Sequence, residues 1–345
     1  MSERTRYGIS RDGLHDLLES WGEPRFRTDQ VWAGIHSARR LEDCTDLPTA
    51  LRSRLAAELP ESLRALTIAH GDDGMTQKWL WAAGDDGAEI ETVLMRYPDR
   101  ATVCVSSQAG CAMGCTFCAT GQAGFDRHLD VGEIVEQVVR ATRAVPERVD
   151  HVVFMGMGEP LANYDATVDA VRRLHDDVGI SARSITVSTV GVVPGIVRLA
   201  DEHLPVTLAV SLHAPTDEQR DLLVPLNRRY PIAEVLEAAE TYQRATGRRV
   251  SFEYAVIAGV NDDLEQAAIL AGLLGDLGPP AVHVNLIPLN PTRDYRGHAP
   301  NRARMDTFAR RLRAAGLHAT VRRNRGTDID AACGQLRSRH VELRR

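Results

Sequence analysis

The chain has 345 residues, of which 43% are hydrophobic and 26% charged, and its formal net charge is −6. This balance is typical of globular proteins, and it excludes a disordered chain, a collagen and a coiled coil. The charge argues against a protein that coats nucleic acid by bulk charge alone, and no apolar run in the sequence approaches the ~20 residues of a membrane-spanning helix.

The first sixty residues are predicted to form a helical accessory domain. Apolar side chains recur there at helical spacing, as at Leu14, Leu18 and Trp21. Residues 64–95 are predicted to form short strands separated by Gly-Asp-Asp-Gly turns. The N-terminal residues lack the apolar stretch of a secretory signal. We therefore expect a cytoplasmic protein without a membrane partner.

From about residue 100 the pattern alternates between strands and helices. The predicted strands are 101–107, 151–156, 184–190, 206–212, 250–257 and 281–288. The predicted helices are 131–143, 164–176, 194–202, 231–245, 262–275 and 302–315. Such alternation indicates a parallel sheet. It predicts an α/β fold, an incomplete (β/α)6 TIM-like barrel, with a doubly wound open sheet as the alternative. The expected division is an accessory domain (1–60), a β linker (61–98) and a partial barrel (99–345).

Three of the six cysteines form a compact motif after the first predicted barrel strand. Cys111, Cys115 and Cys118 have the spacing C-x₃-C-x₂-C in a glycine-rich loop. Three thiolates can hold an iron–sulfur cluster and leave one iron open for a ligand. A structural zinc site is the alternative, with His128 as a fourth ligand.

Polar residues follow four other predicted strands. They are Gly158 and Glu159, Ser188, the run Ser211, Leu212 and His213, and Asn290. Taken alone, each of these residues could simply form a turn or be a polar residue in the core whose hydrogen bonds are all made. Because the carboxyl ends of barrel strands meet at one face, the set predicts a convergent binding pocket.

The cysteine motif, with Phe117 before its last cysteine, resembles that of the radical S-adenosylmethionine (AdoMet) superfamily. Four further segments narrow the resemblance to the RlmN/Cfr family of RNA adenine methyltransferases. They are Gly-Met-Gly-Glu-Pro, Ser-Thr-Val-Gly-Val-Val-Pro, Ser-Leu-His-Ala-Pro and Asp-Ile-Asp-Ala-Ala-Cys-Gly-Gln-Leu. The resemblance implies a 4Fe–4S cluster on the three cysteines, and AdoMet on the strand-end residues. It further implies methylation of adenosine C2 in 23S rRNA, and of adenosine in tRNA.

The resemblance also assigns roles to two isolated cysteines and one carboxylate. It implies that Cys333 is methylated by AdoMet and then carries the methyl group to the base, and that Cys104 releases the product by attacking the Cys333 sulfur. Glu91 matches the family's proton acceptor, whereas Cys44 matches no motif and is expected to pack in the core. Methylation at C8 of the same adenosine is the alternative reaction. A zinc-stabilised RNA-binding protein without activity is the remote alternative.

Basic residues concentrate near Cys333. Residues 301–345 contain 12 Arg and four acidic residues. Arg322, Arg323 and Arg325 could hold RNA phosphates beside the reactive cysteine, although a solvated surface is the simpler explanation for such charges. The expected partners are 23S rRNA, tRNA and an external flavodoxin- or ferredoxin-like electron donor. We expect the protein to act as a monomer.

Overall fold

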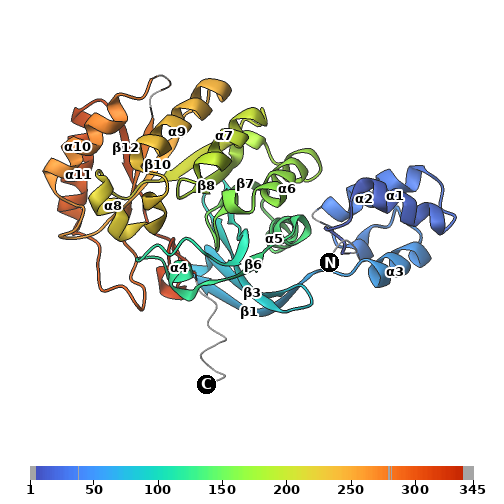
Figure 1. Cartoon of the computed structure of the whole chain (residues 1–345). Coiled ribbons are helices and arrows are strands. Elements are labelled where there is room, and N and C mark those ends of the chain that lie inside the picture. The colour runs from blue at the N-terminus through green and yellow to red at the C-terminus, as the bar shows by residue number, and fades with distance from the viewer. Residues whose placement is uncertain (1–4, 38, 279, 281, 337–345) are drawn as a thin grey trace.

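The computed structural model describes residues 5–37, 39–278, 280 and 282–336. Its main feature is a ten-stranded sheet that curves behind a layer of helices (Figure 1). Seven strands are parallel: β4 (Ala101–Cys104), β7 (Val149–Phe154), β8 (Ile185–Thr189), β9 (Thr207–Ser211), β10 (Ser251–Val256), β11 (His283–Pro288) and β12 (His318–Val321).

The order of the parallel strands identifies a partial barrel. They are neighbours in chain order from β4 to β12, whereas a doubly wound sheet reverses its strand order at a switch point. The predicted α/β partial barrel is therefore confirmed. The seventh strand, β12, was not predicted. It has four residues, and two of their side chains are exposed, so it shows no buried apolar run.

Six long helices follow the parallel strands. They are α5 (Val131–Arg143), α6 (Tyr164–Asp176), α7 (Val193–Asp201), α9 (Ile232–Thr246), α10 (Leu264–Gly275) and α11 (Arg302–Ala314). Their bounds lie within two residues of the predicted ranges. The Asp130 carboxylate accepts from the Glu133 backbone N–H and completes a capping box at the start of α5. Among the described residues, no helix is both long and apolar enough to cross a membrane.

An antiparallel extension precedes the barrel strands. It consists of β1 (Leu63–Gly71), β2 (Thr76–Ala83) and β3 (Ala88–Arg96), and β3 pairs with β4 so that Val93 lies opposite Cys104. Since side chains alternate along a strand, Glu91, Val93 and Met95 share one face of β3. This face brings Glu91 and Met95 to the same side of the sheet as Cys104.

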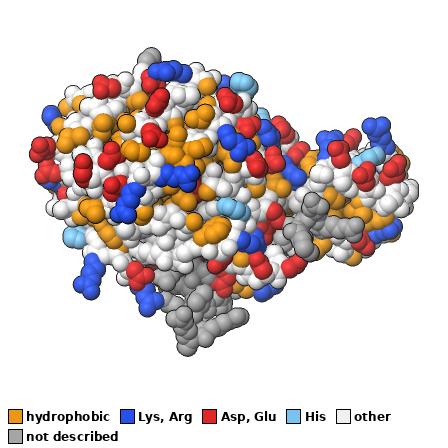
Figure 2. All heavy atoms as spheres, viewed as in Figure 1, with side chains coloured by type: hydrophobic (Ala, Val, Ile, Leu, Met, Phe, Trp, Pro, Cys, Tyr) orange, Lys and Arg blue, Asp and Glu red, His pale blue; other side chains and the backbone are white. Residues whose placement is uncertain are grey.

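The N-terminal helices form a separate knob beside α5 and α6 (Figure 1). They are α1 (Arg11–Ser20), α2 (Phe26–His36) and α3 (Thr49–Glu58). The Trp32 indole donates to the Asp177 carboxylate at 2.7 Å and thereby joins this knob to the end of α6. Cys44 is fully buried in the knob, as expected for a packing residue. Figure 2 shows acidic and basic side chains interspersed on this face of the molecule.

Short elements and the C-terminal segment complete the barrel. The short elements are β5 (Gln108–Gly110), α4 (Ala119–Ala123), β6 (Phe125–His128) and α8 (Asp217–Leu223). The C-terminal segment 322–336 follows β12 and reaches β1 and β2, where Gly326 donates to Asp72 at 2.8 Å. It therefore runs between the two edge strands of the open sheet. The last predicted basic residues, 337–345, lie outside the described residues. The division at residues 60 and 98 stays a prediction.

Candidate active site

A pocket lies at the carboxyl ends of the parallel strands. Ten of the predicted site residues line it: Cys111, Cys115, Cys118, Gly158, Glu159, Ser188, Ser211, His213, Asn290 and Cys333. These residues are spread over more than 200 positions of the chain. Their convergence follows from the parallel sheet, which brings the carboxyl ends of its strands to one face.

Three predicted residues lie outside this pocket. Leu212 is fully buried and does not line the pocket, although its neighbours Ser211 and His213 do. Cys104 lines a small adjoining cavity of about 20 Å³ together with Cys333. Glu91 is 2% exposed and lines neither cavity. The two isolated cysteines are therefore brought together, and Glu91 lies on the neighbouring strand β3.

The loop that carries Cys111, Cys115 and Cys118 is closed tightly by the β5–β6 ribbon. Gly110 has φ +73°, and a Cβ there would lie 2.2 Å from the carbonyl oxygen of Gly124. Burial raises the pKa of the Cys111 thiol to about 12 and the pKa of Cys115 well above its usual value. Thiols in such surroundings become thiolates when a metal centre binds them.

The three thiols fit a cluster better than a single ion. Within the described part of the chain, no three His, Cys, Asp or Glu side chains could hold one metal ion. In a 4Fe–4S cluster the thiolates bind different irons, so they need not converge on one point. His128, the alternative fourth ligand, lies beside the Gln108 amide at 3.0 Å and does not line the pocket.

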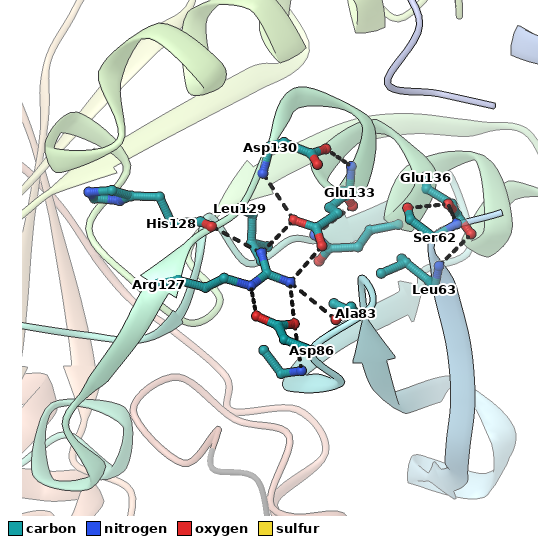
Figure 3. A network of polar contacts seen from close by, with 12 residues as sticks. Ser62, Leu63, Ala83, Asp86, Arg127, His128, Leu129, Asp130, Glu133 and Glu136 are labelled. Atoms are coloured by element: carbon teal, nitrogen blue, oxygen red, sulfur yellow. Dashed lines mark hydrogen bonds and ion pairs between the residues drawn. The ribbon is translucent and has the colours of Figure 1, made fainter. Parts of the chain in front are cut away.

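Arg127 anchors the cluster loop to the rest of the barrel (Figure 3). Its guanidinium donates to the Asp86 carboxylate at 2.6 Å and to both oxygens of Glu133 at 2.8 Å. It also donates to the carbonyl group of Ala83 at the end of β2. The network joins β6, the β2–β3 turn and the start of α5, so it fixes the base of the loop against three elements.

Gly158 and Glu159 line the pocket just after the end of β7, where the backbone packs closely against Gln108. Gly158 has φ +102°, and a Cβ there would lie 2.6 Å from the Gln108 side chain. The Glu159 carboxylate accepts from the backbone N–H groups of Leu161 and Val190 at 3.0 and 2.8 Å. Burial raises its pKa to about 7. The Thr189 side chain also hydrogen-bonds to this carboxylate, which leaves about one of its roughly four lone-pair sites to accept from an ammonium group.

Arg220 is a site residue that the sequence analysis missed. It is fully buried and donates to the carbonyl groups of Val190, Ser211 and Leu212. Its guanidinium thereby fixes the ends of β8 and β9. It lies on α8 in a run of polar residues, which predicts only a solvated helix face.

His213 adopts a left-handed backbone conformation, with φ 63°. The Ala255 N–H donates to its Nδ1 at 3.0 Å, so Nε2 carries the ring proton. Burial lowers the pKa of His213 to about 3, which keeps the ring neutral. Strained conformations of this kind cluster at functional sites.

The Cys333 loop is tied directly to the cluster loop. The Ala119 N–H donates to the carbonyl group of Gly334 at 2.8 Å, and the Thr120 hydroxyl donates to that of Leu336 at 2.6 Å. The Asn290 amide donates to the Cys333 carbonyl at 3.0 Å. Asn290 therefore positions the Cys333 loop as well as lining the pocket.

Arg322, one of the three arginines that we predicted to bind phosphates, is half-buried beside the reactive cysteine. It lines the main pocket and also the small cavity that Cys104 and Cys333 share. Cys333 beside it raises the pKa of the Arg322 guanidinium. Burial raises the pKa of the Cys104 thiol to about 12, and Arg322 acts in the opposite direction. Arg322 is therefore part of the surroundings of the cysteine pair.

Lys78 was also missed. It is the single lysine of the chain, and its ammonium group lies 2.9 Å from the Glu91 carboxylate in a buried ion pair. It also donates to the carbonyl group of Asp330, three residues before Cys333, at 3.2 Å. Lys78 therefore joins Glu91 to the Cys333 loop.

Two family descriptions match the chain. The radical SAM superfamily matches residues 105–271. The ribosomal RNA large subunit methyltransferase N-terminal domain matches residues 7–59.

Similar proteins match almost the whole chain. A probable dual-specificity RNA methyltransferase RlmN of Frankia alni is 53% identical, over 97% of this chain and 84% of the relative. A protein of the same description from Chloroflexus aurantiacus is 51% identical, over 99% of this chain and 94% of the relative. A crystal structure of a radical SAM methyltransferase from Sphaerobacter thermophilus superposes with a TM-score of 0.90 at 50% identity, covering 97% of this chain and 99% of that one.

Proposed function

Because the chain belongs to the RlmN family of radical AdoMet RNA adenine methyltransferases, we propose that it methylates adenosine C2 in 23S rRNA and adenosine in tRNA. The observation that carries this proposal is the cavity that Cys104 and Cys333 share beside the pocket. Two thiols placed this way suit a methyl transfer that passes through one cysteine and is resolved by the other.

The cofactors of the enzyme are a 4Fe–4S cluster and AdoMet. The thiolates of Cys111, Cys115 and Cys118 would hold the cluster, which when bound supplies the electron that cleaves AdoMet to methionine and a 5′-deoxyadenosyl radical. The strand-end residues would hold AdoMet: Gly158, Glu159, Ser188, Ser211, Leu212 through its backbone, His213 and Asn290. The zinc-stabilised alternative without activity has no support from this family.

Methylation begins on Cys333. Its sulfur attacks the methyl carbon of one AdoMet, and the sulfonium bond breaks to release S-adenosylhomocysteine. The S-methyl group of Cys333 would then give up a hydrogen atom to the 5′-deoxyadenosyl radical that the cluster and a second AdoMet supply. The remaining carbon radical adds to adenine C2, so that the RNA is joined to Cys333 through a methylene bridge.

Release requires a base and the second thiol. Glu91 accepts the proton from C2. Because burial raises the pKa of Cys104 to about 12, this thiol must lose its proton to a base before it attacks the Cys333 sulfur. The S–S bond forms as the bond to the methylene carbon breaks. The unpaired electron would pass to the iron–sulfur cluster, left oxidised by the cleavage of AdoMet, and the released carbon takes a proton. An external electron donor then reduces the disulfide.

The test compares three cysteine variants expressed with RNA. Cys104→Ala should accumulate protein joined covalently to RNA, and Cys333→Ala should form neither this adduct nor methylated RNA. Cys44→Ala is the matched control, because Cys44 lies in the N-terminal knob, and it should methylate normally. Normal turnover by Cys333→Ala would overturn the methyl-cysteine route. Mass spectrometry of the nucleoside should show 2-methyladenosine, and 8-methyladenosine would overturn the proposed position.

The remaining assignments concern partners. We propose that residues 1–60 help to bind RNA, because Phe26 is 55% exposed beside Arg27, which stacks over its ring at 5.0 Å. We further propose that the enzyme acts in the cytoplasm as a monomer, with a flavodoxin- or ferredoxin-like electron donor.

A further inference from the structure

A second, larger cavity lies at the amino ends of the barrel strands. Its volume is about 590 Å³, which is within the usual range of roughly 300–1,000 Å³ for ligand sites. Its wall includes residues from the first half of six parallel strands: Thr102, His151, Thr186, Thr207, Ser251 and His283. The pocket that holds the cysteine motif lies at the opposite end of the same strands.

The cysteine pair lies between these two cavities. Met155 and Arg322 line the amino-end cavity, the main pocket and the small cavity of Cys104 and Cys333. Met95 and Arg325 also line both the amino-end cavity and the small one. A ligand in the amino-end cavity would therefore be separated from Cys333 by single side chains.

The chemistry requires two approaches to the carbon on Cys333. The 5′ carbon of AdoMet must reach it to remove hydrogen, and the adenine must reach it to form the new bond. The main pocket faces the cluster cysteines and the AdoMet residues, so it serves the first approach. Hydrogen bonds from Ala119 and Thr120 fasten the Cys333 loop over that side. The adenine needs access from elsewhere.

We propose that the target adenosine enters the barrel through the amino-end cavity and reaches Cys333 past Arg322 and Met155, while the adjoining RNA phosphates bind at the cavity rim. This inference rests on the proposed function and adds the route and orientation of the RNA. Enzymes that modify a base take it out of the stack and bind it in a pocket of this kind.

The charges of the cavity match an RNA strand. Its wall holds Arg100, Arg249, Arg323 and Arg325 in addition to Arg322, and Glu253 is its single acidic residue. Guanidinium groups bind phosphate through paired hydrogen bonds. The Glu253 carboxylate accepts from Ser251 and Asn285 at 2.9 and 2.7 Å, so its hydrogen-bonding capacity is partly used within the wall.

An aromatic ring lies among these cations. The Arg100 guanidinium stacks over the Tyr97 ring at 4.3 Å, and that of Arg325 lies 5.0 Å from the same ring. Aromatic rings and guanidinium planes are the surfaces on which unstacked RNA bases rest. The rim therefore offers both phosphate contacts and a stacking platform for the nucleotides beside the target.

The test removes rim charges that play no part in AdoMet chemistry. One variant carries Arg100→Gln, Arg249→Gln and Arg323→Gln. The matched control carries Arg302→Gln, Arg310→Gln and Arg311→Gln on the exposed side of α11, with the same change in net charge. Both are made in the Cys104→Ala background, in which the RNA adduct accumulates.

Three measurements distinguish failure of the proposed RNA route from failure of the proposed methylation reaction. Methylation of Cys333 without RNA, measured by intact mass, should be equal in all proteins. The rim variant should lose the adduct, and the salt dependence of its RNA binding should weaken by about 0.7 in slope for each phosphate contact removed, the value for single strands. The control should keep both. Adduct formation by the rim variant at the parent rate would overturn the route. Failure of the parent to methylate Cys333 would instead overturn the proposed function.

A second variant tests the cavity itself. Thr186→Trp places a large side chain in the wall without altering a residue of the proposed machinery. It should abolish the adduct while Cys333 is still methylated, which also shows that the barrel is folded. An undiminished adduct in this variant would contradict entry from the amino ends of the strands.

Discussion

Replacing Lys78 by methionine removes the ammonium group that lies 2.9 Å from the Glu91 carboxylate. The two side chains are 11% and 3% exposed, so solvent screens their attraction little. Methionine keeps most of the volume of the lysine side chain, and the variant therefore isolates the charge from the packing. It also removes the hydrogen bond to the Asp330 carbonyl, which helps to hold the Cys333 loop.

The expected loss of stability follows from the burial of the pair. Removing one partner of a buried ion pair lowers the free energy of unfolding by about 3–5 kcal/mol, because the other charge stays in a medium of low polarity. The double variant Lys78→Met with Glu91→Leu should recover much of this loss, since apolar replacements of both partners are often neutral. Exposed pairs are worth only about 0.2–1 kcal/mol. Arg198→Met, which breaks the exposed pair with Asp165, is the matched control.

Urea unfolding of the three variants and their parent measures these differences. In the Cys104→Ala background, Lys78→Met should also slow adduct formation, because the Cys333 loop loses its hydrogen bond from Lys78 to the Asp330 carbonyl. The double variant should regain stability without regaining adduct formation. The reasoning is refuted if Lys78→Met unfolds within 1 kcal/mol of the parent, a loss typical of exposed pairs, or if the double variant is less stable than the single one.

Three further predictions concern packing, cofactor binding and pH. Gly132→Ala should lower the thermal unfolding temperature, because the added Cβ would lie 2.5 Å from the N-terminal backbone; Gly272→Ala, with open space around it, should be neutral or stabilising. Arg220→Gln should weaken AdoMet binding in calorimetry by about tenfold or more, equivalent to at least ~1.4 kcal/mol, and unchanged affinity would contradict its positioning role. Burial lowers the pKa of His36 below 6.5 in the folded chain, so its contribution to stability should fall as the pH drops below 6.5, where the unfolded chain takes up the proton first. His36→Phe should flatten that part of the stability profile, and an unaltered profile would contradict the assignment.

The helices and strands with a regular hydrophobic pattern were predicted well, because the pattern in the sequence agrees with the packing of these elements in the fold. Both α5 and α6 were predicted with their observed bounds, since the apolar residues of each recur at helical spacing and are buried. The opposite face of α6 exposes charges, whereas α5 is covered on all sides and buries the carboxylates of Glu133 and Glu136. The short strand β12 was missed because its half-exposed residues show no such pattern.

The site was predictable only where the chemistry lies in adjacent residues. The spacing of Cys111, Cys115 and Cys118 shows the cluster motif directly. Cys104 and Cys333 are far apart in the chain, and their pairing was implied by the family resemblance. Lys78 and Arg220 act through contacts that the fold creates, so a buried cation cannot be distinguished from a solvated one in the sequence.

The hydrogen bond from Ala119 to Gly334 couples the loop of the three-cysteine motif to the loop that carries Cys333. Ala119 directly follows the ligand Cys118, and its N–H holds the residue after Cys333 at 2.8 Å. A displacement of the cysteine-motif loop would therefore move the backbone of the Cys333 loop as well, because the two loops share this hydrogen bond.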